Sequence, residues 1–324
     1  MELLKKLQND MPLIILTEPI KRLDLLPFKR FLVIFKKCIK YLLGRQRGPQ
    51  AVTKSLLLGL KEIEISFSLN PKKDEIPTGS VVYVNESAEA LRGAIELKKS
   101  GTVSKIIAGP VIAIVPKEEG EVMLDPNIDL FLVPSIWTKD FWVSQAPQLT
   151  ERIKIWTAGV ESDCDLSQRR DVFLVYYKSG PKKQLDIVVD FLESKDIAYN
   201  IVRYGQYNRK EYFALLSRSK GMIYLSESES QGLALCEAWM HNVPTMVWNR
   251  GYWEYCSYRW FDDKISAPYL TEDCGMFFAE KKNFFDTWHN FIDNLEDYRP
   301  RDYALKNFTN KSSARGFIDV INEL

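Results

Sequence analysis

The sequence predicts an α/β protein of two doubly wound domains that face one another across a cleft. Two observations support this prediction. Short apolar runs alternate with amphipathic helical stretches along most of the chain, a pattern typical of a mostly parallel sheet covered by helices. The length of 324 residues suits two domains better than one, because domains most often have roughly 100–150 residues.

The period of the apolar residues places the individual elements. Runs of four or five residues, mostly apolar, predict strands over residues 81–84, 105–108, 130–133, 172–176, 198–202 and 221–225. Stretches of helical period predict helices over residues 87–99, 183–194, 209–217 and 233–241. The last of these ends at Asn242, with Pro244 just beyond, which is an ordinary helix stop.

A polar loop near residue 160 separates two series of strands and helices. Residues 152–156 predict a strand, a polar loop follows over 161–170, and Val172 begins a new series. We therefore expect an N-terminal domain over residues 1–160 and a second domain over residues 161–302. The final stretch, 303–324, is helical in pattern, and we expect it to pack back on the N-terminal domain.

Composition excludes several classes of protein. No stretch approaches the roughly 18 uninterrupted apolar residues of a membrane span, and no signal peptide is visible. The five cysteines are scattered without a CxxC pair, which fits reduced thiols in the cytoplasm rather than a disulfide framework or a zinc site. No G-x-G-x-x-G follows the first strand, so we do not expect a dinucleotide-dependent oxidoreductase.

The N-terminal segment is markedly basic. Residues 1–50 hold eleven Lys and Arg against four Asp and Glu, a balance of +7, in a chain whose net charge is +1. A basic stripe interleaved with Leu, Phe and Ile can attract anionic lipid or an anionic acceptor. We therefore predict peripheral contact with the inner face of a membrane through residues 20–47; the alternative is a solvated helix face. We expect no nucleic-acid partner, because the overall charge is near neutral and no binding motif is visible.

The segment over residues 226–239, Ser-Glu-Ser-Glu-Ser-Gln-Gly-Leu-Ala-Leu-Cys-Glu-Ala-Trp, carries the strongest functional signal. It follows the predicted strand 221–225, and ligands bind at the carboxyl ends of strands in open α/β sheets. Glu229 and Glu237 are eight positions apart, which on one continuous helix leaves them about 80° apart in azimuth. With Glu229 in the loop and Glu237 in the helix, both can face one ligand. Gly232 then opens the helix, whose first N–H groups suit a diphosphate.

Residues 229–237 resemble the E-x7-E signature of retaining GT-B glycosyltransferases, glycosyltransferase family 4 in particular. The resemblance implies two Rossmann-like domains, an acceptor-side domain over residues 1–160 and a nucleotide-sugar donor domain over residues 161–302. It implies that Glu229 hydrogen-bonds the donor sugar and that Glu237 binds the ribose hydroxyls. The backbone amides around Gly232 and Leu233 would meet the phosphates.

Other parts of the chain follow the family's order. Ser230 and Gln231 stand where the family usually has Gly-Phe, at the sugar pocket. Residues 133–160 resemble the "S … GVD" stretch that joins the two domains, with Glu161 in place of the usual Asp. The stretch 45–50 resembles the first-domain Gly-Gly loop. The resemblance places three residues on the acceptor side: Arg47, Gly48 and Ser135.

A diphosphate requires a cation, and Lys178, Lys182 and Lys183 follow the strand 172–176. The family has an Arg followed by a Lys in this place. The resemblance assigns Lys178 to the Arg role and either Lys182 or Lys183 to the Lys role, where they stabilise the departing nucleotide diphosphate. Tyr207 is a candidate for stacking on the nucleobase.

We expect no metal and no other cofactor. The D-x-D pair Asp163 and Asp165 is typical of metal–nucleotide sites in another transferase fold, but here it lies in the expected linker. Metal ligands must converge on one ion, and no other residues suggest such a site.

These observations predict a retaining glycosyltransferase, hexosyltransferase-like, that uses a nucleotide-diphosphate sugar, with UDP or GDP favoured. The acceptor is a glycan or a lipid-linked molecule. A same-face mechanism needs no strong protein base, which fits a chain whose histidines are His241 and His289. Three alternatives stay open: a nucleotide-sugar epimerase, a sugar phosphorylase, and a non-catalytic GT-B-like nucleotide-sugar-binding or scaffolding subunit.

Overall fold

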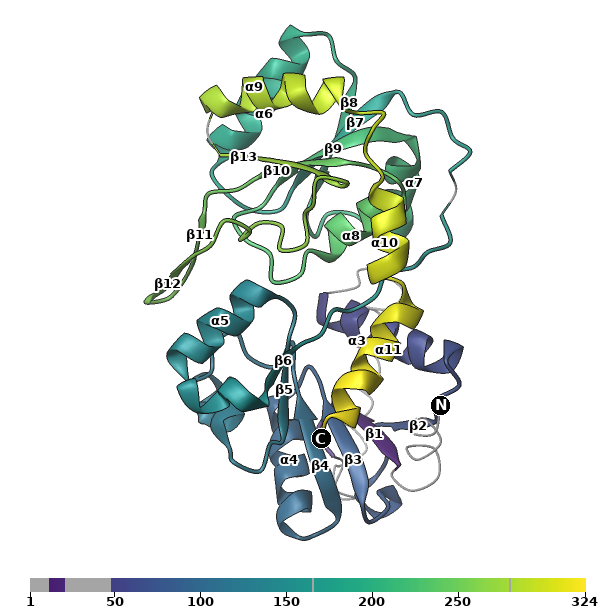
Figure 1. The fold of residues 1–324 in the computed structure, drawn as a ribbon, viewed down its shortest axis with the longest axis vertical. Helices are drawn as coiled ribbons and strands as arrows, with labels where there is room; N and C mark the ends of the chain where they lie inside the picture. The colour runs from purple at the N-terminus through teal and green to yellow at the C-terminus, as the bar shows by residue number, and fades with distance from the viewer. Residues whose placement is uncertain (1–11, 21–47, 165, 280) are drawn as a thin grey trace, which may run out of the picture. The chain divides into compact units, whose positions relative to one another are not determined.

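A computed structural model describes residues 12–20, 48–164, 166–279 and 281–324 (Figure 1). The described chain divides into two compact units. Unit 1 contains residues 12–20, 48–159 and 310–324, and unit 2 contains the described residues of 160–309. The chain therefore passes into unit 2 after Gly159 and returns to unit 1 at Asn310. Arg47 and nearly all of the predicted membrane-contact segment 20–47 lie outside the described residues.

Unit 1 is built on a parallel sheet that, in its described residues, has the order β2-β1-β3-β4-β5-β6. Every residue of β1, β3 and β5 is buried, as expected for a parallel sheet covered on both faces. The strands are β1 (Leu13–Leu16), β2 (Phe67–Leu69), β3 (Ser80–Val84), β4 (Val103–Ala108), β5 (Leu130–Val133) and β6 (Ile153–Ile155). The helices are α3 (Gly48–Glu62), α4 (Ala88–Lys99), α5 (Ile136–Gln145) and α11 (Asn310–Asn322), with 3-10 turns η1 (Lys73–Glu75), η2 (Glu119–Leu124) and η3 (Pro147–Arg152).

The C-terminal helix α11 packs against α3 within unit 1 (Figure 1). A Cβ at Gly59 of α3 would lie 2.0 Å from the carbonyl oxygen of Asn310, so glycine is what permits this close approach. Trp156 Nε1 donates to the carbonyl oxygen of Ser313 over 2.9 Å. The stretch 303–324, expected as one helix, is divided into two. Helix α10 (Pro300–Asn307) belongs to unit 2 and ends before Phe308, whose buried ring packs in the unit 2 core.

Unit 2 holds a second parallel sheet, with the order β13-β10-β9-β7-β8 among its described residues. A separate antiparallel hairpin follows β10. The strands are β7 (Val172–Tyr177), β8 (Tyr199–Arg203), β9 (Ser219–Leu225), β10 (Thr245–Trp248) and β13 (Gly275–Phe278), and the hairpin is β11 (Tyr252–Tyr255) with β12 (Tyr258–Phe261). The helices are α6 (Lys182–Ser194), α7 (Arg209–Arg218), α8 (Leu233–Met240), α9 (Lys281–Asp293) and α10.

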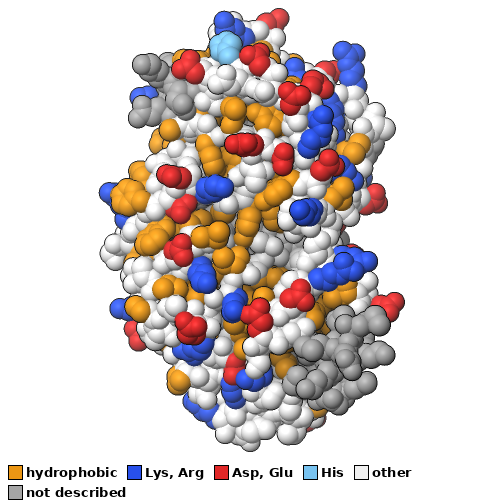
Figure 2. Space-filling view, in the orientation of Figure 1, with side chains coloured by type: hydrophobic (Ala, Val, Ile, Leu, Met, Phe, Trp, Pro, Cys, Tyr) orange, Lys and Arg blue, Asp and Glu red, His pale blue; other side chains and the backbone are white. Residues whose placement is uncertain are grey.

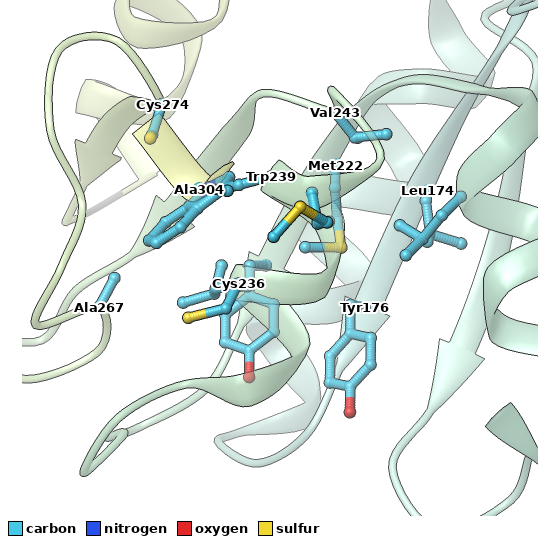
Figure 3. Close-up of a cluster of buried hydrophobic side chains, with 14 of the residues drawn as sticks. Leu174, Tyr176, Met222, Cys236, Trp239, Val243, Ala267, Cys274 and Ala304 are labelled. Atoms are coloured by element: carbon cyan, nitrogen blue, oxygen red, sulfur yellow. The ribbon is translucent and has the colours of Figure 1, made fainter. Parts of the chain in front are cut away.

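Alternate side chains of the unit 2 strands enter two different cores, because successive residues of a strand point to opposite faces. Phe173 and Val175 pack with residues of α6 and α9. Leu174 and Tyr176 pack with residues of α7, α8 and α10. Figure 3 shows part of this second cluster, with Trp239 of α8 among its labelled residues. The sheet of unit 2 is thus a buried middle layer between helices.

Apart from the divided stretch 303–324, the sequence-predicted strands and helices are confirmed, each within two residues of its expected bounds. Strands β1, β2, β10 and β13 and the hairpin were not predicted. No helix of the described residues is long and apolar enough to cross a membrane. On the face drawn in Figure 2, Lys and Arg side chains are interspersed with Asp and Glu rather than gathered into one patch.

Candidate functional site

The order of strands in unit 2 reverses direction between β7 and β9. From β7 the chain adds β8 on one side, and it then returns to the other side of β7 with β9. The backbone N–H groups of Lys178 and Ser179 both donate to the carbonyl oxygen of Leu225, over 2.8 and 3.4 Å. The segments that follow β7 and β9 therefore leave the sheet side by side. Ligands of open α/β sheets bind at such a switch point, outside the carboxyl ends of the strands.

Glu229, which follows β9, is held by side chains from both segments. Lys178 Nζ donates to both carboxylate oxygens over 2.8 Å. The hydroxyl of Tyr224 donates to Oε1 over 2.6 Å, and Ser226 Oγ donates to the same oxygen over 3.0 Å. Only 6% of the Glu229 side chain is exposed, against 30% for Lys178. The Glu229 carboxylate is thus fixed in orientation, and its cation remains accessible to solvent.

Lys178 is also positioned by an aromatic ring and by the loop that carries it. Its Nζ lies 5.3 Å from the centre of the Tyr204 ring. Gly180 has φ 116°, and a Cβ there would lie 2.6 Å from the Trp248 ring. Both this φ angle and these surroundings therefore require glycine at position 180. Ser179 Oγ accepts the backbone N–H of Glu227 over 3.0 Å, which joins this loop to the segment that carries Glu229.

The segment that carries Glu229 has a second support, from the stretch after the hairpin. The backbone N–H of Glu229 donates to the carbonyl oxygen of Ile265 over 2.8 Å. Ser266 Oγ donates to the carbonyl oxygen of Ser226 over 2.9 Å. These bonds hold the loop on one side, while Ser179 holds it on the other.

Gly232 immediately precedes α8, as the sequence indicates. Its φ of 84° and ψ of 56° are left-handed, a conformation that favours glycine. The first N–H groups of any helix, here from Leu233 onward, have no acceptor within the helix, and they carry the positive end of its dipole. Gln231 is buried and Ser230 is exposed. This helix start therefore has the geometry of an anion site directly after Glu229.

Glu237 lies on α8 and is paired with a different cation. Arg209 Nε and Nη2 both reach Glu237 Oε1, over 3.0 and 2.8 Å. Arg209 Nη1 donates to Glu161 Oε1 over 2.7 Å. Glu229 and Glu237 thus each have a basic partner of their own, Lys178 for Glu229 and Arg209 for Glu237.

The remaining predicted donor residues are Lys182, Lys183 and Tyr207. Lys182 and Lys183 are the first two residues of α6 and are exposed. The hydroxyls of Tyr207 and Tyr176 are 2.6 Å apart, and burial raises the pKa of Tyr207 to about 12. Tyr207 also packs against the core cluster on the α8 face of the sheet.

Of the predicted acceptor-side residues, Gly48 and Ser135 belong to unit 1, and Arg47 lies outside the described residues. Gly48 is the first residue of α3, and a Cβ there would contact nothing within 4 Å. Ser135 is buried and forms a capping box at the start of α5, where its backbone N–H donates to Thr138 Oγ1 over 3.1 Å. In this structure, Ser135 therefore serves to cap helix α5.

Several site residues were not predicted from the sequence: Tyr224, Ser226, Ser179, Arg209 and Glu161. Tyr224 and Ser226 stand next to the predicted strand end, so their proximity to Glu229 is a local signal. Arg209 begins a predicted helix, but nothing local indicates which carboxylate it meets. Among the described residues, no three His, Cys, Asp or Glu side chains are grouped so that they could hold a metal ion.

No protein-family model and no curated protein matches the sequence. Solved structures do match the fold. The apo form of the lipopolysaccharide outer core galactosyltransferase WaaB aligns over 97% of this chain and 100% of its own, at 12% identity and a TM-score of 0.61. Anabaena Alr3699/HepE, solved with UDP and glucose, aligns over the same shares at 10% identity and a TM-score of 0.59.

The chain spans less than two thirds of some longer matches. It covers 57% of a TarM chain from S. aureus, solved with fondaparinux, alpha-GlcNAc-glycerol and UDP, with 77% of this chain aligned at 12% identity and a TM-score of 0.51. At such identities the likeness shows the fold alone. The fold is GT-B, with two Rossmann-like domains, and the predicted fold class is confirmed.

Proposed function

We propose that this protein is a retaining glycosyltransferase that moves a sugar from a nucleotide-diphosphate sugar to an acceptor without a metal ion. One observation carries the proposal. Lys178, Glu229 and the start of α8 come together at the switch point of the unit 2 sheet. A carboxylate for sugar hydroxyls, a cation and a helix start for phosphates are the groups that such a donor requires.

Each donor-site residue has a proposed role. Glu229 accepts hydrogen bonds from the hydroxyls of the donor sugar, next to Ser230 and Gln231. The backbone amides of Gly232 and Leu233 bind the diphosphate. The remaining roles rest on the resemblance to family 4: Glu237 binds the ribose, Tyr207 stacks on the base, and Lys182 or Lys183 assists Lys178. UDP and GDP are the favoured nucleotides.

Lys178 supplies the charge stabilisation in this mechanism. The bond between the anomeric carbon and the diphosphate oxygen breaks, and a bond to the acceptor oxygen forms on the same face of the sugar. The acceptor proton passes to the departing phosphate. Negative charge develops on that phosphate, and a positioned ammonium beside it lowers the barrier. We propose no cofactor, because Lys178 and the α8 start supply the positive charge themselves.

The acceptor is proposed to be a glycan or a lipid-linked molecule held by unit 1. The support is the resemblance of Arg47 and Gly48 to the family's first-domain loop. We also propose cytoplasmic, peripheral contact with anionic membrane through residues 20–47, on the +7 balance of residues 1–50. Pelleting with phosphatidylserine vesicles at low salt, reversed at high salt, is the expected result. Failure to pellet at any salt concentration would remove the membrane proposal.

The donor site is tested by calorimetry and thermal shift with UDP, GDP, ADP and their common sugar conjugates. We expect one nucleotide family to stabilise the wild type and not the Glu237→Ala variant. Glu229→Gln and Lys178→Ala should each lower turnover by about 100-fold or more. Lys195→Ala, an exposed lysine at the end of α6, is the matched control and should leave turnover unchanged.

Other outcomes separate the alternatives. Unchanged turnover in both Glu229→Gln and Lys178→Ala would contradict the assignment of the active site. Tight binding of a nucleotide sugar without transfer or hydrolysis, across a broad acceptor panel, would indicate a binding subunit. Conversion of the donor sugar without any acceptor would indicate an epimerase.

A further inference from the structure

Arg209 lies between two carboxylates that come from different segments of unit 2. It is the first residue of α7, Glu237 lies on α8, and Glu161 follows the point where the chain enters the unit. Two nitrogens of the guanidinium reach Oε1 of Glu237, and the third reaches Oε1 of Glu161. All three nitrogens of Arg209 are therefore engaged by these two residues.

The arrangement differs from an ordinary surface ion pair, which contributes little because long side chains remain mobile. The side chains of Arg209 and Glu237 are 25% and 14% exposed. The guanidinium carbon lies 4.8 Å from the centre of the Phe213 ring, one turn further along α7. The planar guanidinium is thus restrained by the ring on one face and by carboxylates at its edge.

The backbone of Arg209 is restrained as well. Asn208 caps α7: its side chain accepts the backbone N–H of Glu211 over 3.0 Å. The Glu211 side chain accepts the backbone N–H of Asn208 over 3.0 Å in return. This capping box fixes the first turn of α7, so Arg209 starts from a defined position.

We infer that Arg209, itself held by Glu161, is a positioning residue that sets the orientation of the Glu237 carboxylate for a ribose diol. The inference rests on the proposed function, in which Glu237 binds the ribose hydroxyls. Both Arg209 contacts engage one oxygen of Glu237, so they set the rotation of the carboxylate about its last bond. Two neighbouring hydroxyls require a carboxylate in a defined plane, because hydrogen bonds weaken steeply when they are misaligned. Arg209 and Glu161 therefore make the donor site selective for ribonucleotides.

The test compares ribonucleotides with analogues that lack the two hydroxyls. Dissociation constants are measured by calorimetry for UDP against 2′,3′-dideoxyuridine diphosphate, and for GDP against 2′,3′-dideoxyguanosine diphosphate. We expect the wild type to prefer the ribonucleotide by about tenfold or more, since hydrogen bonds to a charged group are strong. Arg209→Gln should reduce this preference to about threefold or less, through weaker binding of the ribonucleotide alone.

Matched variants separate positioning from folding. Arg218→Gln removes an exposed arginine at the other end of the same helix and should keep the full preference. Arg209→Lys keeps the charge without the planar fork and should restore only part of the preference. Glu161→Gln, which leaves Arg209 and Glu237 in place, should lower the preference in the same direction and covers the case in which Arg209→Gln does not fold.

The outcomes distinguish this inference from the proposed function. If the wild type binds no nucleoside diphosphate, the proposed function fails and the inference fails with it. If the wild type binds and prefers the ribonucleotide, the donor site stands. In that case, an unchanged preference in Arg209→Gln and Glu161→Gln overturns the positioning role. If a variant loses affinity equally for the ribonucleotide and for its dideoxy analogue, the positioning role is also overturned, because such a loss indicates that the residue only supports the structure.

Discussion

The pair Lys178 and Glu229 makes a measurable prediction about stability. Removing one partner of a fully buried ion pair costs about 3–5 kcal/mol, and exposed pairs contribute less than about 1 kcal/mol. The side chains here are 6% and 30% exposed, so water replaces part of the lost interaction. After Lys178→Met, Tyr224 and Ser226 still donate to the carboxylate. We expect the free energy of unfolding to fall by about 2 kcal/mol.

A double-mutant cycle isolates the interaction. Lys178→Met, Glu229→Gln and the double variant are unfolded in urea and followed by tryptophan fluorescence, with the transition of unit 2 analysed separately if the units unfold in two steps. The double variant leaves no charge buried. The sum of the losses in unfolding free energy of the two single variants should therefore exceed the loss of the double variant by about 1–2 kcal/mol.

An exposed ion pair in the same unit is the matched control. Arg259 and Glu254 of the hairpin are in contact, with side chains 57% and 39% exposed. Their cycle should give a coupling of less than about 1 kcal/mol. If the Lys178 and Glu229 costs are additive within about 0.5 kcal/mol, the described contact between them does not contribute to stability and the reasoning is refuted.

Three further predictions concern backbone strain, pH and thiol reactivity. Gly275→Ala places a Cβ 1.8 Å from a carbonyl oxygen of β10, whereas a Cβ at Gly205, which has φ 77°, would meet nothing within 4 Å. In urea unfolding, Gly275→Ala should therefore lower the free energy of unfolding by at least about 2 kcal/mol more than Gly205→Ala does. Equal losses in the two variants would contradict the close packing at Gly275. Burial lowers the pKa of His241 below 6.5, so the folded state binds fewer protons than the unfolded state. The stability that this difference contributes above pH 6.5 should be lost as pH falls through the lower folded-state pKa. A His241→Gln variant whose stability has the same pH dependence would contradict this. Burial raises the pKa of the Cys236 thiol, and Cys256 is exposed, so iodoacetamide should label Cys256 on the order of tenfold faster, as mass spectrometry of the labelled peptides would show.

Much of the fold follows from the sequence because strands such as β3, β5 and β9 are buried along nearly their whole length, and helices such as α4 and α6 have 12 and 13 residues. A continuous run such as 130–133 contrasts clearly with the helical period of 87–99. Strand β10, over Thr245–Trp248, is as short as the run 130–133 but less evident, because it begins with the polar Thr245 directly after Pro244 and ends at a polar turn. The hairpin Tyr252–Phe261 carries aromatic and charged residues on half-exposed strands, so it lacks the alternation of a one-sided sheet.

The candidate site is predictable only where its signals are local. Gly232 and Glu229 fall between a strand and a helix that the sequence already indicates, so their position could be derived. Lys178 is 51 residues before Glu229, and Arg209 is 28 residues before Glu237. Such contacts depend on the order of strands in the sheet, which hydrophobic period does not encode. The resemblance supplied Lys178, whereas the Arg209 contact is evident only from the structure.

The hydrogen bonds of Lys178 bear on which ligand suits this site. An ammonium has three N–H donors, and two of those of Lys178 are directed at the oxygens of Glu229. Under the proposed function, a diphosphate at the start of α8 would compete with Glu229 for this cation, and alone it would leave a buried carboxylate with one partner fewer. The hydroxyls of a sugar can donate to the same carboxylate oxygens and replace the bonds that Lys178 gives up. The proposed donor carries both groups and would therefore satisfy the site in a way that neither group does separately, because each part compensates for the hydrogen bonds that the other displaces.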